Sequence, residues 1–119
     1  MPANAGCAPV RIAVTSRDGV GVNERFHRAT DYFVFELRDG RAAFVERRRR
    51  PAGDGRLFRD FSTLERLLAG CRWVVSLGFN GEARRELSAR GFLLHEARGP
   101  IETVLRALPS DSLAPPAGA

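Results

Sequence analysis

Tyr32-Phe33-Val34-Phe35-Glu36-Leu37 is an aromatic and β-branched stretch that predicts a β-strand. The pair Asp39-Gly40 follows it, and Asp-Gly is a strong signal for a tight hairpin turn. The segment 42–46 is therefore expected to return as an antiparallel strand. Upstream, Val10–Thr15 alternates in the manner of a strand, and Ser16–Gly19 follows it as a turn.

In the second half of the chain, helical spacing alternates with short apolar runs. These patterns predict helices at 61–68, 82–90 and 101–108, and strands at 73–77 and 92–95. Ser62 or Asp60 is the expected N-cap of the first helix, and Pro100 is expected in the first turn of the last one. The charged segment 47–56 is expected to be a loop.

The predicted order is three strands, followed by helix, strand, helix, strand and helix. A meander followed by alternating elements implies a mixed sheet with parallel crossovers in its second half. The expected fold is therefore α/β and ribonuclease-H-like, with a five-stranded mixed sheet and about three flanking helices.

The length of 119 residues suits one domain, which we expect at residues 10–108. Residues 1–9 and 109–119 are rich in small residues and proline, and are expected to be a disordered lead and a disordered tail. No apolar run is long enough for a membrane span or a signal peptide. Two cysteines, one of them in the lead, do not suggest a disulfide scaffold, so a cytoplasmic location is expected.

The chain carries 19 basic residues, all of them arginine, against 14 acidic ones, which gives a net charge of +5. Such a balance suits nucleic acid or any other anionic ligand. Nucleic-acid binding also needs aromatic side chains beside the arginines, and only Phe58 and Phe61 lie near the run Arg47–Arg50. Nucleic acid is therefore the less favoured partner.

The sequence lacks the signatures of common enzymes. A ribonuclease-H nuclease needs carboxylates for two metal ions, yet the strands at 10–15 and 73–77 carry none. There is no nucleophile elbow, no phosphate-binding glycine loop and no Cys-x-x-Cys zinc spacing. A non-enzymatic protein is expected.

Several segments match one family pattern in order and spacing. The turn Ser16–Gly19 occupies the place of an Ala/Ser-Ser-x-Asp-Gly motif, and Arg25–Ala29 that of a His-Phe-Gly-x-Ala motif. Three later segments agree as well: Leu67–Val75 with Leu-x-x-Cys-x-x-Val, Gly78–Leu87 with Gly-x-x-x-x-Ala-x-x-x-Leu, and Gly91–Leu105 with a Gly-Ile…Ile-x-x-x-Leu ending. Over residues 10–108 the chain thus resembles the nitrogenase iron–molybdenum cofactor biosynthesis family.

The resemblance implies a ribonuclease-H-like fold and non-catalytic binding of an iron–sulfur or iron–molybdenum cofactor, or its precursor, during nitrogenase maturation. The expected partners are an anionic metal cluster and the nitrogenase assembly proteins or apo-nitrogenase. A bulky anionic cluster suits a basic pocket with one or two soft or imidazole ligands.

The resemblance places the site in the loop from Asn23 to Arg28. Arg25 stands where the family has its histidine, and His27 stands two residues later. His27 can replace the lost ligand if the segment is extended, since residues i and i+2 then share a face. Arg25, with Arg28 and Asn23, can instead contact the anionic periphery of the cluster.

Two further alternatives stay open at this stage. Cys71 is a second candidate metal ligand, although a free cysteine at the start of a buried strand is commonly a core residue. The site can also have been lost, which would leave a metal-free interaction or regulatory module that uses Arg47–Arg50.

Overall fold

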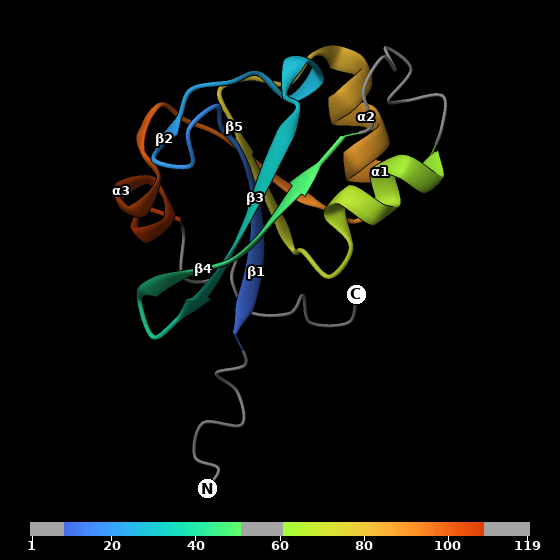
Figure 1. Ribbon diagram of the computed structural model, residues 1–119. Helices are drawn as coiled ribbons and strands as arrows, with labels where there is room; N and C mark the ends of the chain where they lie inside the picture. The colour runs from blue at the N-terminus through green and yellow to red at the C-terminus, as the bar shows by residue number, and fades with distance from the viewer. Residues whose placement is uncertain (1–8, 51–60, 109–119) are drawn as a thin grey trace, which may run out of the picture.

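The computed structural model describes residues 9–50 and 61–108 (Figure 1). Its five longer strands are β1 (Val10–Thr15), β3 (Asp31–Arg38), β4 (Arg41–Arg49), β5 (Trp73–Ser76) and β6 (Leu93–Glu96). Its helices are α1 (Phe61–Leu68), α2 (Gly81–Ala89) and α3 (Ile101–Arg106). Two short strands, β2 (Gly21–Val22) and β7 (Gly99–Pro100), and the 3-10 turn η1 (Phe26–Arg28) complete the described elements.

The large sheet has the strand order β4-β3-β1-β5-β6. Strands β1, β3 and β4 form an antiparallel meander, whereas β5 runs parallel to both β1 and β6. The mixed five-stranded sheet with three helices confirms the predicted α/β, ribonuclease-H-like fold. No helix within the described ranges is long and apolar enough to cross a membrane.

Apolar side chains along the central strands point alternately to the two faces of the sheet, and a hydrophobic core lies on each face. Ala13 and Val74 face the core under α1 and α2, and their neighbours Ile12 and Val75 face the core under α3. Figure 1 shows α3 on one side of the sheet and the other two helices on the opposite side. Burial on both faces explains why β5 is a continuous apolar run.

The hairpin turn has the predicted chemistry. Asp39 and Gly40 adopt φ angles of 52° and 77°, a pair of left-handed conformations that Asp-Gly tolerates well. The expected loop at 47–56 is wrong in its first part, because β4 continues through Arg49 in register with β3. The rest of that segment lies mainly outside the described residues.

Contacts from the arginine run explain why the strand continues. The guanidinium of Arg48 donates to carbonyls at the end of α1, at 2.8 Å for Ala69 and 3.2 Å for Leu67. The side chains of Arg47 and Arg49 both donate from Nε to the same oxygen of Asp31, each at 3.0 Å. Repulsion within the run is therefore offset by specific acceptors, which the sequence pattern alone does not reveal.

Several boundaries differ from those predicted. Helix α1 begins at Phe61, so Ser62 lies within it, and Asp60 lies outside the described residues. Pro100 is the N-cap of α3 and belongs to β7, and α3 ends at Arg106. The two-residue pairing of β2 with β7 was not predicted, since such short ladders carry no periodic signal. The expected lead and tail fall mainly on residues 1–8 and 109–119, outside the described ranges.

Position 19 needs glycine for two reasons, its backbone conformation and the close approach of the Phe33 ring. Its φ is +76°, and a Cβ there would lie 2.7 Å from Cε2 of Phe33. We expect Gly19→Ala to lower the free energy of unfolding by about 2–4 kcal/mol, from the left-handed conformation and the clash together. Urea denaturation measures this loss.

Gly40→Ala is the matched control, because Gly40 has a φ of +77° and a Cβ added there would have no neighbour within 4 Å among the residues that the structure describes. It should lose only about 1 kcal/mol, the cost of the backbone conformation. Equal losses in the two variants would contradict a role for the contact with Phe33.

Candidate functional site

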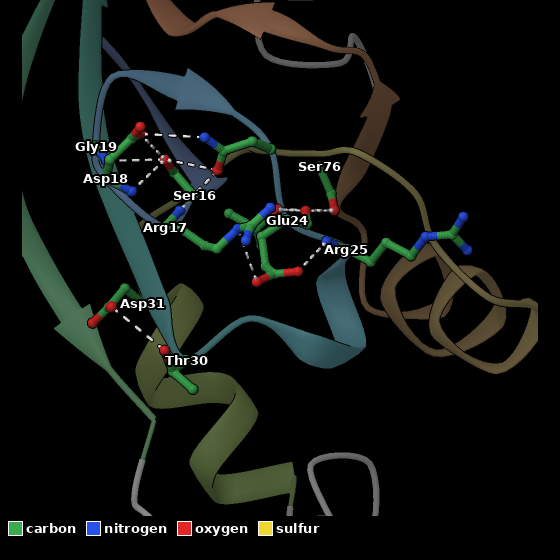
Figure 2. Close-up of polar contacts among 11 residues, drawn as sticks. Ser16, Arg17, Asp18, Gly19, Glu24, Arg25, Thr30, Asp31 and Ser76 are labelled. Carbon is green, nitrogen blue, oxygen red and sulfur yellow. Dashed lines mark hydrogen bonds and ion pairs between the residues drawn. The ribbon is translucent and has the colours of Figure 1, made fainter.

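The loop that carries the predicted site is held at the carboxyl ends of β1 and β5 by one backbone carbonyl. The carbonyl of Glu24 accepts hydrogen bonds from the Thr15 hydroxyl at 2.7 Å, the Ser76 hydroxyl at 3.1 Å and the Leu77 amide at 3.2 Å. Thr15 and Ser76 are fully buried, and their hydroxyls are 2.9 Å apart. Figure 2 shows Ser76 and Glu24 meeting at this point. The loop therefore starts from a fixed position.

The turn between β1 and β2 is closed by its own side chains. The carboxylate of Asp18 accepts from the amides of Val20 at 2.9 Å and Gly21 at 3.1 Å, and these bonds lower the pKa of Asp18 to about 2. The side-chain oxygen of Asn23 accepts from the Arg17 amide at 2.9 Å. Asn23, predicted as a cofactor contact, is thus engaged in holding this turn.

η1 is anchored by the ring of Phe26, which is fully buried. The ring lies 5.6 Å from that of Tyr32 and 5.5 Å from that of Phe79, centroid to centroid. The Phe26 amide donates to the Gly78 carbonyl at 3.0 Å, and its carbonyl accepts from the Tyr32 hydroxyl at 3.1 Å. Burial raises the pKa of that hydroxyl, so it stays protonated as a donor. The inward anchor leaves Arg25 and Arg28 exposed.

An extended segment was the condition for His27 to replace the family histidine, and it is not met, because residues 26–28 form a 3-10 turn. At three residues per turn, positions i and i+2 do not share a face. Arg25 lies just before the turn with extended dihedrals. His27 therefore does not project in parallel with the position of the family histidine, as the sequence argument required.

His27 nevertheless has an unusual environment. Its ring is half-buried, and Nδ1 is shielded from solvent without a hydrogen-bond partner in the described part of the chain. Its carbonyl accepts from Arg50 at 3.3 Å. A metal can reach this ring only through its other nitrogen, Nε2, which is also a common metal-binding atom.

Cys71 lies elsewhere. It precedes β5, while η1 lies against Gly78 beyond the other end of that strand. The four residues of β5 alone span about 13 Å. Cys71 lines a surface hollow of about 550 Å³ with Leu68 and Phe92, and burial raises the pKa of its thiol. His27 and Cys71 are therefore not brought together, and the thiol is the less ready metal ligand because metals bind the thiolate.

Clustered metal ligands are not found in the described ranges: no group of three or more His, Cys, Asp or Glu side chains is placed to hold a metal ion. The site thus offers one imidazole and neighbouring guanidinium groups. This donor set suits contact with an anionic ligand more than a closed metal centre.

Comparison with known families decides the relationship. The profile of the family described as dinitrogenase iron-molybdenum cofactor matches residues 8–110. The chain belongs to this family. The result confirms the resemblance found in the motifs, and it associates this family member with the iron–molybdenum cofactor of dinitrogenase.

One solved structure supports the fold. The structure titled "Crystal structure of PH0822" is similar with a TM-score of 0.64 at 20% identity, covering 82% of this chain and 88% of that one. At this identity the likeness supports the fold alone. Comparison with curated proteins gives no match.

The pair Thr15 and Ser76 was missed by sequence reasoning. The only signal was a small hydroxyl residue at or next to the end of each of two predicted apolar strands. Pairing between those strands, which only the fold supplies, brings the two hydroxyls to one carbonyl.

We expect Ser76→Ala to lower the free energy of unfolding by about 1–2 kcal/mol, because the buried hydroxyl that donates to the Glu24 carbonyl and accepts from the Gly78 amide is lost. Amide exchange at Phe26 should also become faster, since its loop loses an anchor. Denaturation and hydrogen exchange measure the two effects. Ser88→Ala, on the exposed face of α2, should change stability by less than about 0.5 kcal/mol. Exchange at Phe26 that is unchanged by Ser76→Ala would contradict the anchoring role.

The pH dependence of the turn follows from Asp18. Because its pKa is lowered in the folded state to about 2, its stabilising effect is present above the ordinary value and is lost as the pH falls toward 2. Asp18→Asn should therefore be less stable than the wild type at pH 7, and the difference should shrink between about pH 4 and pH 2. Thermal unfolding across this range tests it, and a constant difference would contradict the assignment.

Proposed function

We propose that this family member binds an iron–sulfur or iron–molybdenum cofactor, or its precursor, without catalysis and delivers it during nitrogenase maturation. The partners are the nitrogenase assembly proteins or the apo-nitrogenase, in the cytoplasm. Family membership supports the association with the cofactor, and the loop from Arg25 to Arg28 is the candidate for its contact.

The observation that carries the proposal is the composition of η1 and its flank. His27, which is half-buried, lies in the sequence between the exposed residues Arg25 and Arg28, on a turn anchored by a buried phenylalanine. Iron accepts imidazole as a ligand, and arginines attract an anionic cluster and hydrogen-bond its organic acid or sulfur periphery. Because the anchor is buried, the cargo meets a turn that is already ordered, which reduces the entropic cost of binding.

The small number of ligands supports a role as a carrier. A resident cluster is held by several protein ligands, usually cysteine thiolates. In the described ranges this loop offers one metal-binding side chain, so most of the affinity would come from charge and hydrogen bonds. Such a cargo can be released to a protein that supplies more ligands.

A metal-free interaction module of the same fold is the alternative. The presence of arginine at Arg25, where the family motif has histidine, favours it, as does the missing hydrogen-bond partner at His27 Nδ1 in the described part of the chain. Ligating histidines usually donate their second ring nitrogen to an acceptor that orients the ring.

Anaerobic reconstitution with iron and sulfide, followed by gel filtration, tests the proposal. Iron counted per chain should be stoichiometric in the wild type, lost in His27→Ala and retained in Cys71→Ala. Arg25→Ala should load iron more weakly, and the difference from the wild type should shrink at higher salt, because charge attraction is screened. Circular dichroism confirms that each variant is folded.

Other outcomes point elsewhere. Iron lost only in Cys71→Ala would move the site to the hollow at the start of β5. No protein-bound iron under conditions that load a family member with an intact His-Phe-Gly motif would overturn the carrier role and leave the interaction module.

A further inference from the structure

The two large hydrophobic side chains that are exposed in the described ranges gather on the α3 face of the sheet. Val20 is 69% exposed and Phe44 is 57% exposed. Val20 follows the glycine that lies over the ring of Phe33, and Phe44 pairs with Phe35 on the neighbouring strand. Single exposed apolar residues are common, but two of them on one face beside arginines need an explanation.

A β-bulge places Phe44 on the same face as the arginines. Phe35 pairs with Phe44 and Phe33 pairs with Arg47, although 44 and 47 would lie on opposite faces of a regular strand. The register shift between Val34 and Phe35 leaves Val45 as the extra residue and restores the common face. The ring of Phe44 lies 5.7 Å from that of Phe35 and 6.2 Å from that of Phe33.

A depression lies beside this aromatic group. It has a volume of about 280 Å³ and is lined by Gly19, Val20, Phe35, Pro100, Ile101 and Glu102. Phe35 therefore lines the depression, and its ring also lies against that of Phe44. An apolar side chain of a partner can enter here and cover Val20 and Phe44 at the same time.

Two guanidinium groups flank the apolar area with a fixed orientation. Arg47 and Arg49 are 46% and 67% exposed, and each donates through Nε to one oxygen of Asp31. Burial raises the pKa of Asp31, but hydrogen bonds from both arginines outweigh it and hold the pKa below its usual value. Because each arginine is held through Nε, its terminal Nη groups are oriented, and no other side chain in the described ranges hydrogen-bonds them. The two Nη groups of each arginine can donate to both oxygens of one carboxylate, so the pair of arginines suits an acidic ligand.

We propose that this surface, formed by Val20, Phe35, Phe44, Arg47 and Arg49, docks an acidic polypeptide segment of a partner protein. An aliphatic or aromatic side chain of the segment fills the depression, and neighbouring carboxylates meet the two arginines. The surface lies on the face opposite the core that holds Phe26, so it is separate from the proposed cluster site.

Charge and shape favour this occupant over two others. A second copy placed symmetrically on this face would bring the arginine pair of one chain toward that of the other, which costs free energy. The expectation that only Phe58 and Phe61 lie near the arginine run is wrong, because the Phe33 ring lies 5.8 Å from the guanidinium of Arg47 and contacts Phe44. Nucleic acid could therefore use Phe44 as a stacking platform, but Val20 and the apolar depression offer nothing to a base. A mixed apolar and acidic peptide satisfies both parts of the surface.

Fluorescence anisotropy with short synthetic peptides tests the proposal on the full chain. The probe is a labelled peptide of alternating glutamate and leucine of about seven residues, long enough for one strand. The counter-probes are its lysine–leucine counterpart and an oligothymidine of about 16 nucleotides. The acidic peptide should bind, and rising salt should weaken it.

Three single variants locate the binding. Phe44→Ala and Val20→Ala each remove an apolar side chain beside the depression. Arg49→Ala removes one of the two guanidinium groups, while Arg47 still pairs with Asp31. Each should weaken the acidic peptide about fivefold to tenfold or more. Arg85→Ala, an exposed arginine on α2, is the control of equal charge and should leave the affinity unchanged.

Acidic-peptide binding that these three variants leave unchanged, or no binding at all, would overturn the proposal. Oligothymidine binding that is lost in Phe44→Ala would overturn it in favour of nucleic acid. A dimer in sedimentation that dissociates in the same variant would overturn it in favour of a second copy. Iron loading of Phe44→Ala should equal that of the wild type, so this proposal and the carrier function fail separately.

Discussion

The carbonyl of Glu24 is the point on which the arrangement of the candidate site depends. Three donors from two neighbouring parallel strands and the residue after one of them converge on it within 3.2 Å, and two of them are hydroxyls buried at the strand ends. Buried polar groups cost free energy unless they are paired, and both hydroxyls find an acceptor in this one carbonyl. The path of the chain from β2 to η1 is set by this junction, and Phe26 then fixes the turn through its buried ring. The Glu24 junction and the buried Phe26 ring fix the backbone on which Arg25, His27 and Arg28 lie.

The two faces of the sheet have different roles as a consequence. The face under α1 and α2 holds the core that contains Phe26, so the candidate cluster contacts on η1 lie at the edge of that core. The other face is covered by α3, a helix of six residues, and the outer strands carry Phe44 and the arginine pair beyond it. A short helix cannot bury a five-stranded sheet. The surface that it leaves open is where exposed apolar side chains and oriented charges occur together, and the β-bulge at Val45 is what aligns them.

Much of the fold could be predicted because its signals are local. Alternation at Val10–Thr15, the Asp-Gly turn and the apolar run at Trp73 each indicate their element without knowledge of the rest. The length of β4 could not be predicted, because four consecutive arginines favour a loop until the buried Asp31 and the end of α1 supply acceptors. The 3-10 turn at residues 26–28 could not be predicted for a related reason. Its stability comes from contacts of Phe26 with Gly78 and Phe79, which are distant in sequence. Candidate ligands could be named from the sequence, but their mutual geometry depends on such long-range contacts.

Transfer of a cluster imposes two requirements that one site meets poorly. Strong ligation holds the cargo and opposes its release, whereas weak ligation leaves delivery to chance encounters. A loop with one imidazole and a few arginines favours release, since the receiving protein can outcompete it with more ligands. Encounter with the right receiver must then come from another part of the molecule, and the arginine-flanked apolar surface on the opposite face can supply it. Linking a weak cargo site to a separate docking surface raises the effective concentration of the receiver without strengthening the hold on the cargo. Under the two proposals together, arginine at position 25 in place of the family histidine would lower affinity for the cluster, and docking would preserve delivery.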